Sequence, residues 1–360
     1  MVPFPQIGRY CRNLGMGGRK TVRRSGLVLM AKALCSLLAA GSLAAATSAR
    51  AQTVLCDAAL KRLDSAIAAR DQAALEREGF DIGGQPGCDP DMVRPKRREA
   101  ALILSDLARK AAQGDAPAEA VRERYLKARR VAAVWPVVQG LADLAYTKRE
   151  WNEAAKLYSD FLVTVQDPDP DAPAIPPAVT LLAYQRASET QMLIDPDLAP
   201  LPRTRAGEAG GLDAVLATRE GGLRDLVPRV RLMPVTFATN GATMTPQGRV
   251  FAERWWESIR ASAAPALLLA GHSDPRGNVQ RNETLSLQRP AALASFLQEK
   301  GYTGTLTVVG YGPRCPKPLS PGSSYTAAEQ FQIQRRVEIM PSGTLPDGYC
   351  RGVKPVTAQQ

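Results

Sequence analysis

The segment from Leu267 to Leu297 combines a polar loop with a charged helix position, and both features are suited to ligand binding. An apolar run ends in Gly-His-Ser-Asp, and Leu285, Arg289 and Leu293 then follow at a spacing of four residues. This spacing places Arg289 on the apolar stripe of a helix. A permanently charged guanidinium is costly there unless an anion pairs with it. The spacing therefore predicts that something pairs with Arg289, and it leaves the identity of that partner open.

His272, Ser273 and Asp274 are the side-chain types of a hydrolase triad, but they stand in direct succession. Consecutive side chains near a strand end alternate between two faces, so a nucleophile, a base and an orienting carboxylate cannot converge. His272 is instead expected to make a structural hydrogen bond at the strand end. No Gly-x-Ser-x-Gly motif, phosphate loop or metal motif occurs in the sequence, so we expect neither catalysis nor a cofactor.

The N-terminal segment has the pattern of an export signal. Residues 1–51 contain eight Lys/Arg and no Asp or Glu, and a mostly apolar stretch over 27–46 is followed by Ala-Arg-Ala directly before Gln52. This pattern is typical of a secretory signal peptide, with Met30 as an alternative start. A membrane anchor is the other interpretation. Lys32 interrupts the apolar run, however, and the rest is shorter than the roughly 20 residues that span a bilayer.

The positive charge of the chain belongs mainly to this signal. The whole sequence has 46 Lys/Arg and 35 Asp/Glu, a formal net charge of +11. Without the eight basic residues of 1–51 the net charge is +3. Nucleic-acid binding thereby loses its main support, and we expect no nucleic-acid partner.

Four cysteines remain after residue 51, namely Cys56, Cys88, Cys315 and Cys350. An even number of cysteines in an exported protein indicates two disulfides. Three pairings are possible, and proximity in the sequence favours Cys56–Cys88 and Cys315–Cys350. Because His272 is the only histidine, we do not expect a Cys/His zinc site.

The first part of the mature chain has a helical pattern rich in Ala, Arg and Leu. Leu60, Leu63, Ile67 and Leu75 predict one helix over 58–78. After a turn-rich break at 79–91, the pattern predicts helices at 97–112, 117–132, 134–147, 151–165 and 174–193.

The helical pair over 134–165 resembles a tetratricopeptide repeat. The matching residues are Leu141, Ala142, Ala145, Trp151, Ala154 and Tyr158. In such a repeat the small residues let two antiparallel helices approach, and the aromatic residues fill the gaps between them. An ordinary helical hairpin is the alternative. Both interpretations give an interaction surface for a protein partner.

A Pro/Gly-rich connector after residue 194 marks the expected domain boundary, and beyond it the pattern changes to short strands. Apolar or β-branched runs predict strands at 230–237, 266–271, 305–312 and 335–340. Helical patterns at 245–263 and 283–300 separate the first three strands. The order β-α-β-α-β, followed by an irregular segment and a last strand, predicts helices on one face of a mixed sheet.

The region 230–341 resembles the OmpA-like peptidoglycan-binding domain. The elements "VTFATNGATMTPQG", "GHSDPRG", "NETLSLQR", "VVGYG" and "RRVEI" occur in the order and spacing of that family. The resemblance implies binding of the diaminopimelate side chain in the peptidoglycan stem peptide, which ends in an amino-acid zwitterion. It further implies that Asp274 takes the ammonium and Arg289 the carboxylate. In this comparison Asn282 holds the loop shape, and Gly277 permits a tight turn.

The alternative for these two charges is a structural ion pair that closes the loop onto the helix. The sequence also departs from the family at three places. Ala238 stands where an acidic residue is frequent, and Gln334 replaces the usual Asn. Pro290 follows Arg289, and a proline there predicts a kink or a late helix start.

Together these features predict an α+β protein, with an all-α N-terminal domain of helical hairpins before a β-α-β-α-β mixed-sheet domain. The expected divisions are a signal peptide (1–51), a helical adaptor (52–194), a linker (195–228), the OmpA-like domain (229–341) and a C-terminal tail (342–360). The expected function is non-catalytic peptidoglycan binding in the periplasm of a diderm bacterium. This binding tethers the helical adaptor, and through it an envelope protein partner. The protein is expected to associate with the cell wall and to lie peripheral to the outer membrane. The alternative is an envelope protein scaffold whose OmpA-like domain has lost peptidoglycan affinity.

Overall fold

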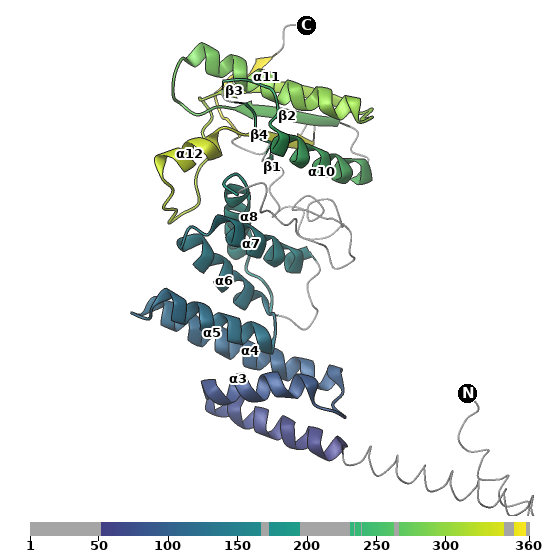
Figure 1. Ribbon diagram of the computed structural model, residues 1–360, viewed down its shortest axis with the longest axis vertical. Coiled ribbons are helices and arrows are strands. Elements are labelled where there is room, and N and C mark those ends of the chain that lie inside the picture. The colour runs from purple at the N-terminus through teal and green to yellow at the C-terminus, as the bar shows by residue number, and fades with distance from the viewer. Residues whose placement is uncertain are drawn as a thin grey trace, which may run out of the picture. The chain divides into compact units, whose positions relative to one another are not determined.

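The computed structural model describes residues 52–166, 173–194, 231–233, 235–238, 240–262, 266–341 and 349–357. The chain divides between Arg97 and Arg98 into two compact units, and Figure 1 labels most of their helices and strands. The predicted signal peptide and the predicted linker lie outside the described residues, so both stay predictions. Among the residues that are described, no helix has the length and apolar character needed to cross a membrane.

In the described part of the first unit, helical residues over 52–69 are followed by α3 (Gln72–Asp81) and the short 3₁₀ helix η1 (Ile82–Gly84). The prediction of one helix over 58–78 is therefore wrong. Arg70 adopts a left-handed conformation with φ of 50°. The Asp71 side chain then caps α3 by accepting hydrogen bonds from Ala73 N and Ala74 N. A capping aspartate inside a continuous apolar pattern favours a helix break that periodicity alone does not reveal.

The predicted disulfide in this unit is confirmed. Cys56 and Cys88 are bonded and link the first helix to the segment that precedes α4 (Pro90–Gln113). Helix α4 begins earlier than the predicted residue 97, because the Asp89 side chain accepts a hydrogen bond from Asp91 N and caps it.

The second unit contains the helices α5 (Ala118–Val131), α6 (Trp135–Thr147), α7 (Trp151–Gln166) and α8 (Pro177–Gln191). The predicted hairpin over 134–165 is present as α6 and α7. Its matching residues Leu141, Ala142, Ala145, Ala154 and Tyr158 are buried. Gly140 lets α6 approach α5, because a Cβ atom there would lie 2.3 Å from the Tyr125 ring. The hairpin is confirmed, while its assignment as a tetratricopeptide repeat stays a prediction.

A five-stranded sheet has the order β1-β4-β2-β3-β5. Its strands are β1 (Arg231–Met233), β2 (Ala266–His272), β3 (Thr305–Gly312), β4 (Val337–Pro341) and β5 (Val356–Thr357). Strands β2 and β3 are parallel and the other pairs are antiparallel, so the sheet is mixed as predicted. The predicted fold class is confirmed. Strand β5 was not predicted and lies within the expected C-terminal tail.

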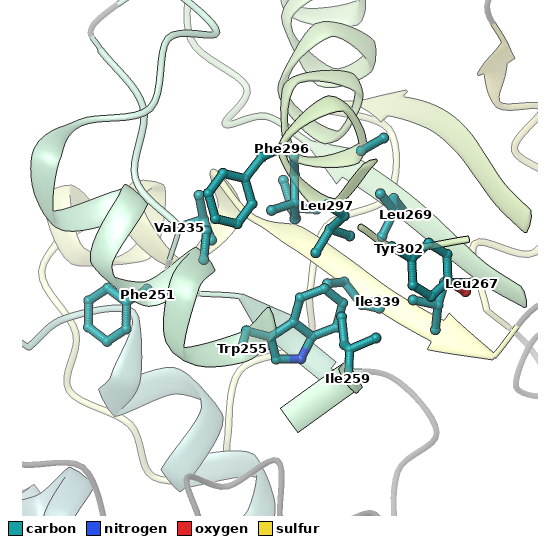
Figure 2. Close-up of a cluster of buried hydrophobic side chains, with 14 residues drawn as sticks. Val235, Phe251, Trp255, Ile259, Leu267, Leu269, Phe296, Leu297, Tyr302 and Ile339 are labelled. Atoms are coloured by element: carbon teal, nitrogen blue, oxygen red, sulfur yellow. The ribbon is translucent and has the colours of Figure 1, made fainter. Parts of the chain in front are cut away.

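One face of the sheet carries α10 (Pro246–Ser262) and α11 (Val279–Glu299), as the sequence predicted. Figure 2 shows Trp255 and Ile259 of α10, Phe296 and Leu297 of α11, and Ile339 of β4 in one apolar cluster. A third helix, α12 (Ala327–Gln334), replaces the irregular segment expected before the last strand. Its signal is the capping box that starts at Thr326, which the sequence analysis did not recognise.

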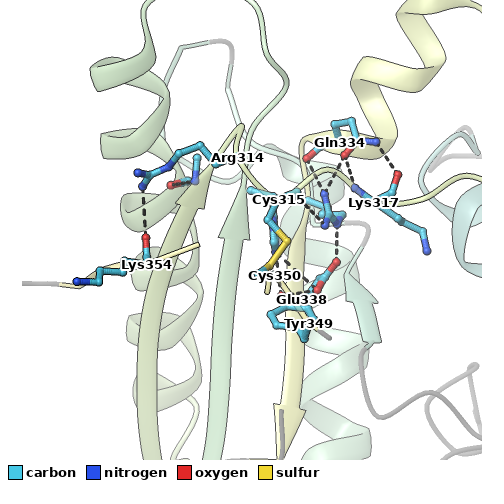
Figure 3. The surroundings of a disulfide bond; sticks show 12 residues. Arg314, Cys315, Lys317, Gln334, Glu338, Tyr349, Cys350 and Lys354 are labelled. Atoms are coloured by element: carbon cyan, nitrogen blue, oxygen red, sulfur yellow. Dashed lines mark hydrogen bonds and ion pairs between the residues drawn. A yellow bond between two sulfur atoms is a disulfide. The ribbon is translucent and has the colours of Figure 1, made fainter. Parts of the chain in front are cut away.

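The other face of the sheet is covered by the C-terminal segment. Met340 and Tyr311 pack there with Cys315, Tyr349 and Cys350. The predicted Cys315–Cys350 disulfide is confirmed and holds this segment over the sheet (Figure 3).

Candidate ligand site at the end of β2

The carboxyl end of β2 lies directly against the middle of α11. A Cβ atom at Gly271 would be 1.8 Å from the Ser286 carbonyl oxygen, and one at Gly310 would be 2.6 Å from Ser286 Oγ. Glycine is therefore required where the helix crosses the two parallel strands. Pro290 has no N–H to donate to the Ser286 carbonyl. Helix α11 nevertheless starts at Val279 and continues through Pro290, so the late helix start that the proline suggested does not occur.

This packing holds Arg289 inside the protein, where it is 8% exposed. Its Nε donates to the Gly241 carbonyl oxygen at 3.2 Å, and its guanidinium carbon lies 5.7 Å from the centre of the Phe237 ring. Within the described part of the chain, no carboxylate oxygen lies within the 4.0 Å of an ion pair with Arg289. Burial lowers the pKa of Arg289, the charge of Arg335 lowers it further, and Asp274 opposes them. Among the described residues, the contacts of this buried cation are one backbone acceptor and one ring face.

Asp274 is 7% exposed and pairs with two other arginines. Its Oδ1 accepts from Arg276 N at 3.0 Å and from Arg276 Nε at 3.2 Å. Its Oδ2 accepts from Arg276 Nη2 at 3.1 Å and from Arg335 Nη1 at 2.7 Å. Burial raises the pKa of Asp274, but these hydrogen bonds outweigh it and bring the pKa to about 2. The structural ion pair between Asp274 and Arg289 that the sequence left open is not found in the described residues.

The loop that carries Asp274 is held by a side chain of α11. Asn282 Nδ2 donates to the carbonyl oxygens of Asp274 and Arg276 at 3.1 and 2.7 Å. Gly277 has a backbone φ of 82°, a conformation that residues other than glycine rarely adopt. Asn278 caps α11 by accepting from Arg281 N. The loop and the helix start therefore form one connected structure.

Arg276 and Arg335 are site residues that the sequence analysis missed. Arg335 stands at the predicted start of the last strand, and the structure places it between α12 and β4. Arg276 lies over the ring of Phe331 in α12, with its guanidinium carbon 4.3 Å from the ring centre. Arg276 and Arg335 pair with Asp274, and Arg289 interacts with it electrostatically, so three guanidinium groups and one carboxylate give the site a net positive charge. This balance suits an anionic group that approaches Arg289.

His272 faces away from this site and belongs to a buried charged network. It is fully buried, stacks on Tyr311, and has its Nε2 3.0 Å from Tyr349 Oη and 3.6 Å from Glu338 Oε2. Burial lowers the pKa of His272, and the charge of Arg336 lowers it further. Burial raises the pKa of Glu338, yet the neighbouring Arg336 brings it well below its usual range. Since His272 and Asp274 contact different groups, the described residues contain no triad from this motif.

The same network contains the ion pair between Arg336 and Glu338. Figure 3 shows Glu338 beside the disulfide. Arg336 Nε donates to Glu338 Oε1, and Tyr349 Oη donates to Glu338 Oε2 at 2.6 Å. The spacing of Arg336, directly before β4, and Glu338 within it was the available signal for a buried pair. His272 also lies near the sulfur atoms of Cys315 and Cys350, with ligand atoms within 4.8 Å of one another. Because the sulfurs are bonded to each other, they are not free to coordinate a metal.

Comparison with known proteins gives structural similarities only. No family model matches the sequence, and no curated protein matches it. The chain is similar to the cell wall anchor of the T6SS from Pseudomonas aeruginosa, with 24% identity and a TM-score of 0.26 over 31% of this chain and 76% of that chain. It is also similar to the periplasmic domain of MotB (residues 64–256 of that protein), with 17% identity and a TM-score of 0.26 over 31% of this chain and 59% of that chain.

Proposed function

We propose that residues 229–341 bind peptidoglycan without catalysis, through the diaminopimelate of the stem peptide. The observation that carries this proposal is the buried guanidinium of Arg289, which has no carboxylate partner in the described part of the chain. A buried charge without a counter-ion is costly. A ligand carboxylate in bidentate contact with Arg289 would supply the missing counter-charge.

The rest of the ligand is recognised by Asp274. Diaminopimelate carries an ammonium next to its carboxylate, and a carboxylate side chain is the natural acceptor for it. Arg276, which now binds Asp274, has a side chain that is 59% exposed. A ligand ammonium can therefore replace Arg276 at Asp274 at a smaller cost in free energy than it could replace the more buried Arg335.

The wider context of the proposal is a cell-wall tether. Two disulfides favour an oxidising compartment, and the resemblance of 230–341 to the OmpA-like domain points to the periplasm. In this proposal the protein associates with the cell wall, peripheral to the outer membrane, and the helices of 52–194 contact an envelope protein partner. No residue of the proposed site is assigned a catalytic role.

Co-sedimentation of the full chain with purified sacculi tests the proposal. The variants Arg289→Ala and Asp274→Ala each remove one charge-assisted contact and leave its counterpart unpaired, so the affinity should fall by about 2–5 kcal/mol, which is roughly 30-fold or more. Arg289→Lys should also sediment poorly with sacculi, because a lysine ammonium cannot reproduce the planar, forked hydrogen bonding of a guanidinium. The matched control is Arg281→Ala, which removes an exposed arginine from the same helix and should bind like wild type.

Circular dichroism must show that each variant is folded. Sacculi with lysine in place of diaminopimelate lack the terminal carboxylate and should bind poorly. If folded Arg289→Ala and Asp274→Ala proteins sediment as wild type does, the site assignment is wrong. If wild type itself does not sediment with diaminopimelate sacculi, the alternative of a protein scaffold without peptidoglycan affinity replaces the proposal.

A further inference from the structure

Helix α12 contacts the candidate ligand site at its C-terminal end. Arg335 follows the last residue of the helix and donates to Asp274 Oδ2 at 2.7 Å. One turn earlier, the ring of Phe331 lies under the guanidinium of Arg276. Both arginines that hold Asp274 are therefore positioned by α12.

The N-terminal end of the same helix is held by the hairpin of α6 and α7. Glu329 in the first turn of α12 accepts from Arg149 Nη2 at 2.7 Å and from Trp151 Nε1 at 2.8 Å. Its Oε2 also accepts from the backbone N–H of Thr326 and completes the capping box. A single carboxylate thus caps α12 and joins it to the connection between two helices that lie about 180 residues earlier in the chain.

The segment that leads into α12 is held by a buried carboxylate of α8. Glu189 is completely buried, and its Oε1 accepts from Ser320 N at 2.8 Å. Its Oε2 accepts from Ser320 Oγ at 2.7 Å and from Tyr325 Oη at 2.9 Å. Tyr146 of α6 hydrogen-bonds Ser320 Oγ, and its ring lies edge-on to Tyr325. A buried carboxylate with three donors from one loop fixes that loop strongly, because every lost contact would leave a buried polar group unpaired.

Further contacts make the interface continuous. Gln332 Nε2 in α12 donates to the Met192 carbonyl oxygen at 2.7 Å, just after α8. Gln185 Nε2 and Arg186 Nη2 in α8 donate to the carbonyl oxygens of Pro318 and Pro321. Helices α6–α8 therefore contact both α12 and the loop before it.

We propose that Glu189 and Glu329 are positioning residues of the ligand site. Through them, helices α6–α8 hold α12 in the place where Arg335 meets Asp274, so these helices are a structural part of the site and not a separately tethered adaptor. The expected effect on the affinity for sacculi rests on the proposed peptidoglycan function. The positioning of α12 and Arg335 does not rest on it and can be measured without ligand.

Amide hydrogen exchange of the full chain tests the positioning. In Glu189→Gln, amides of 317–335 and the Arg276 amide, which donates to Asp274 Oδ1, should exchange about tenfold faster or more. Exchange in β2 and β3 should not change. The matched control is Glu119→Gln, which removes an exposed partner of Lys148 in the same helical region and should leave all of these segments as in wild type.

A milder variant keeps the test decisive if Glu189→Gln fails to fold. Arg149→Glu places a second carboxylate beside Glu329 and should accelerate exchange at Arg276, whereas Arg149→Lys keeps the positive charge and should leave that exchange close to wild type. A role of Arg149 confined to general stability would not produce this dependence on the sign of its charge. Unchanged exchange at Arg276 in both folded Glu189→Gln and folded Arg149→Glu overturns the inference.

The affinity for sacculi is the second measurement. Glu189→Gln should weaken sedimentation about tenfold, since the positioning of Arg335 is lost while Arg289 stays in place. If wild type binds sacculi and the variant with accelerated exchange binds equally well, the positioning of the ligand site is refuted and the proposed function stands. If wild type does not bind, the proposed function fails, while the exchange experiment still decides the inference.

Discussion

Replacing Asp274 with asparagine should change how the stability of the second unit depends on pH. Burial raises the pKa of the carboxyl, but hydrogen bonds from Arg276 and Arg335 bring it from 3.8 to about 2. A carboxyl whose pKa is lower in the folded chain stabilises the fold above its unfolded pKa. That contribution is lost as the pH falls through the folded pKa. A difference of almost two pH units corresponds to about 2 kcal/mol in the free energy of unfolding.

Wild type should therefore be more stable than Asp274→Asn by about 2 kcal/mol at pH 7. The difference should shrink between about pH 4 and pH 2 and vanish below, where wild type is protonated too. Urea unfolding followed by tryptophan fluorescence measures this difference in the free energy of unfolding, because all four tryptophans lie after residue 97 in the second unit. The disulfides must stay oxidised throughout.

Two results would refute this reasoning. If the stability difference is independent of pH, the effect of the substitution comes from packing and not from the charge of Asp274. If Asp274→Asn is more stable than wild type at pH 7, the cost of burying the carboxylate exceeds its attraction to Arg276 and Arg335.

Two further substitutions test the packing of β2 against α11 and the competition between Arg276 and the ligand for Asp274. Gly271→Ala should destabilise the second unit by about 3 kcal/mol, because the new Cβ would meet the Ser286 carbonyl at 1.8 Å and a backbone atom cannot move aside. Urea unfolding measures this loss, and the control in the same unit is Gly114→Ala, whose new Cβ would have its nearest atoms at 3.8 Å and should cost far less. Arg276→Ala should raise the affinity for diaminopimelate sacculi about threefold to tenfold, because it frees Asp274 for the ligand ammonium at the loss of a largely exposed ion pair, and equal or weaker sedimentation would show that Arg276 does not compete with the ligand.

The elements of the sheet unit could be predicted because their signals are local. Alternating and helical apolar patterns identified β2, β3, α10 and α11 within a few residues of their observed bounds. The disulfides followed from the even number of cysteines and their proximity in the sequence. Arg289 was identified because a charge on an apolar helix stripe is anomalous whatever surrounds it. Two local signals were present but unused, namely the Asp71 cap that breaks the first predicted helix and the Thr326 capping box of α12.

The partners of the site charges were decided only by the tertiary structure. The resemblance to the OmpA-like domain implied that Asp274 and Arg289 share one ligand, and the fold adds Arg335, which it brings to Asp274 from 61 residues away. It likewise brings Ser320 to the buried Glu189 from 131 residues away. Periodicity and capping depend on residues a few positions apart, so the sequence alone determines where helices and strands form. Which carboxylate meets which donor depends on how those elements pack, because hydrogen bonds form only within about 3 Å and many pairings satisfy the same local pattern.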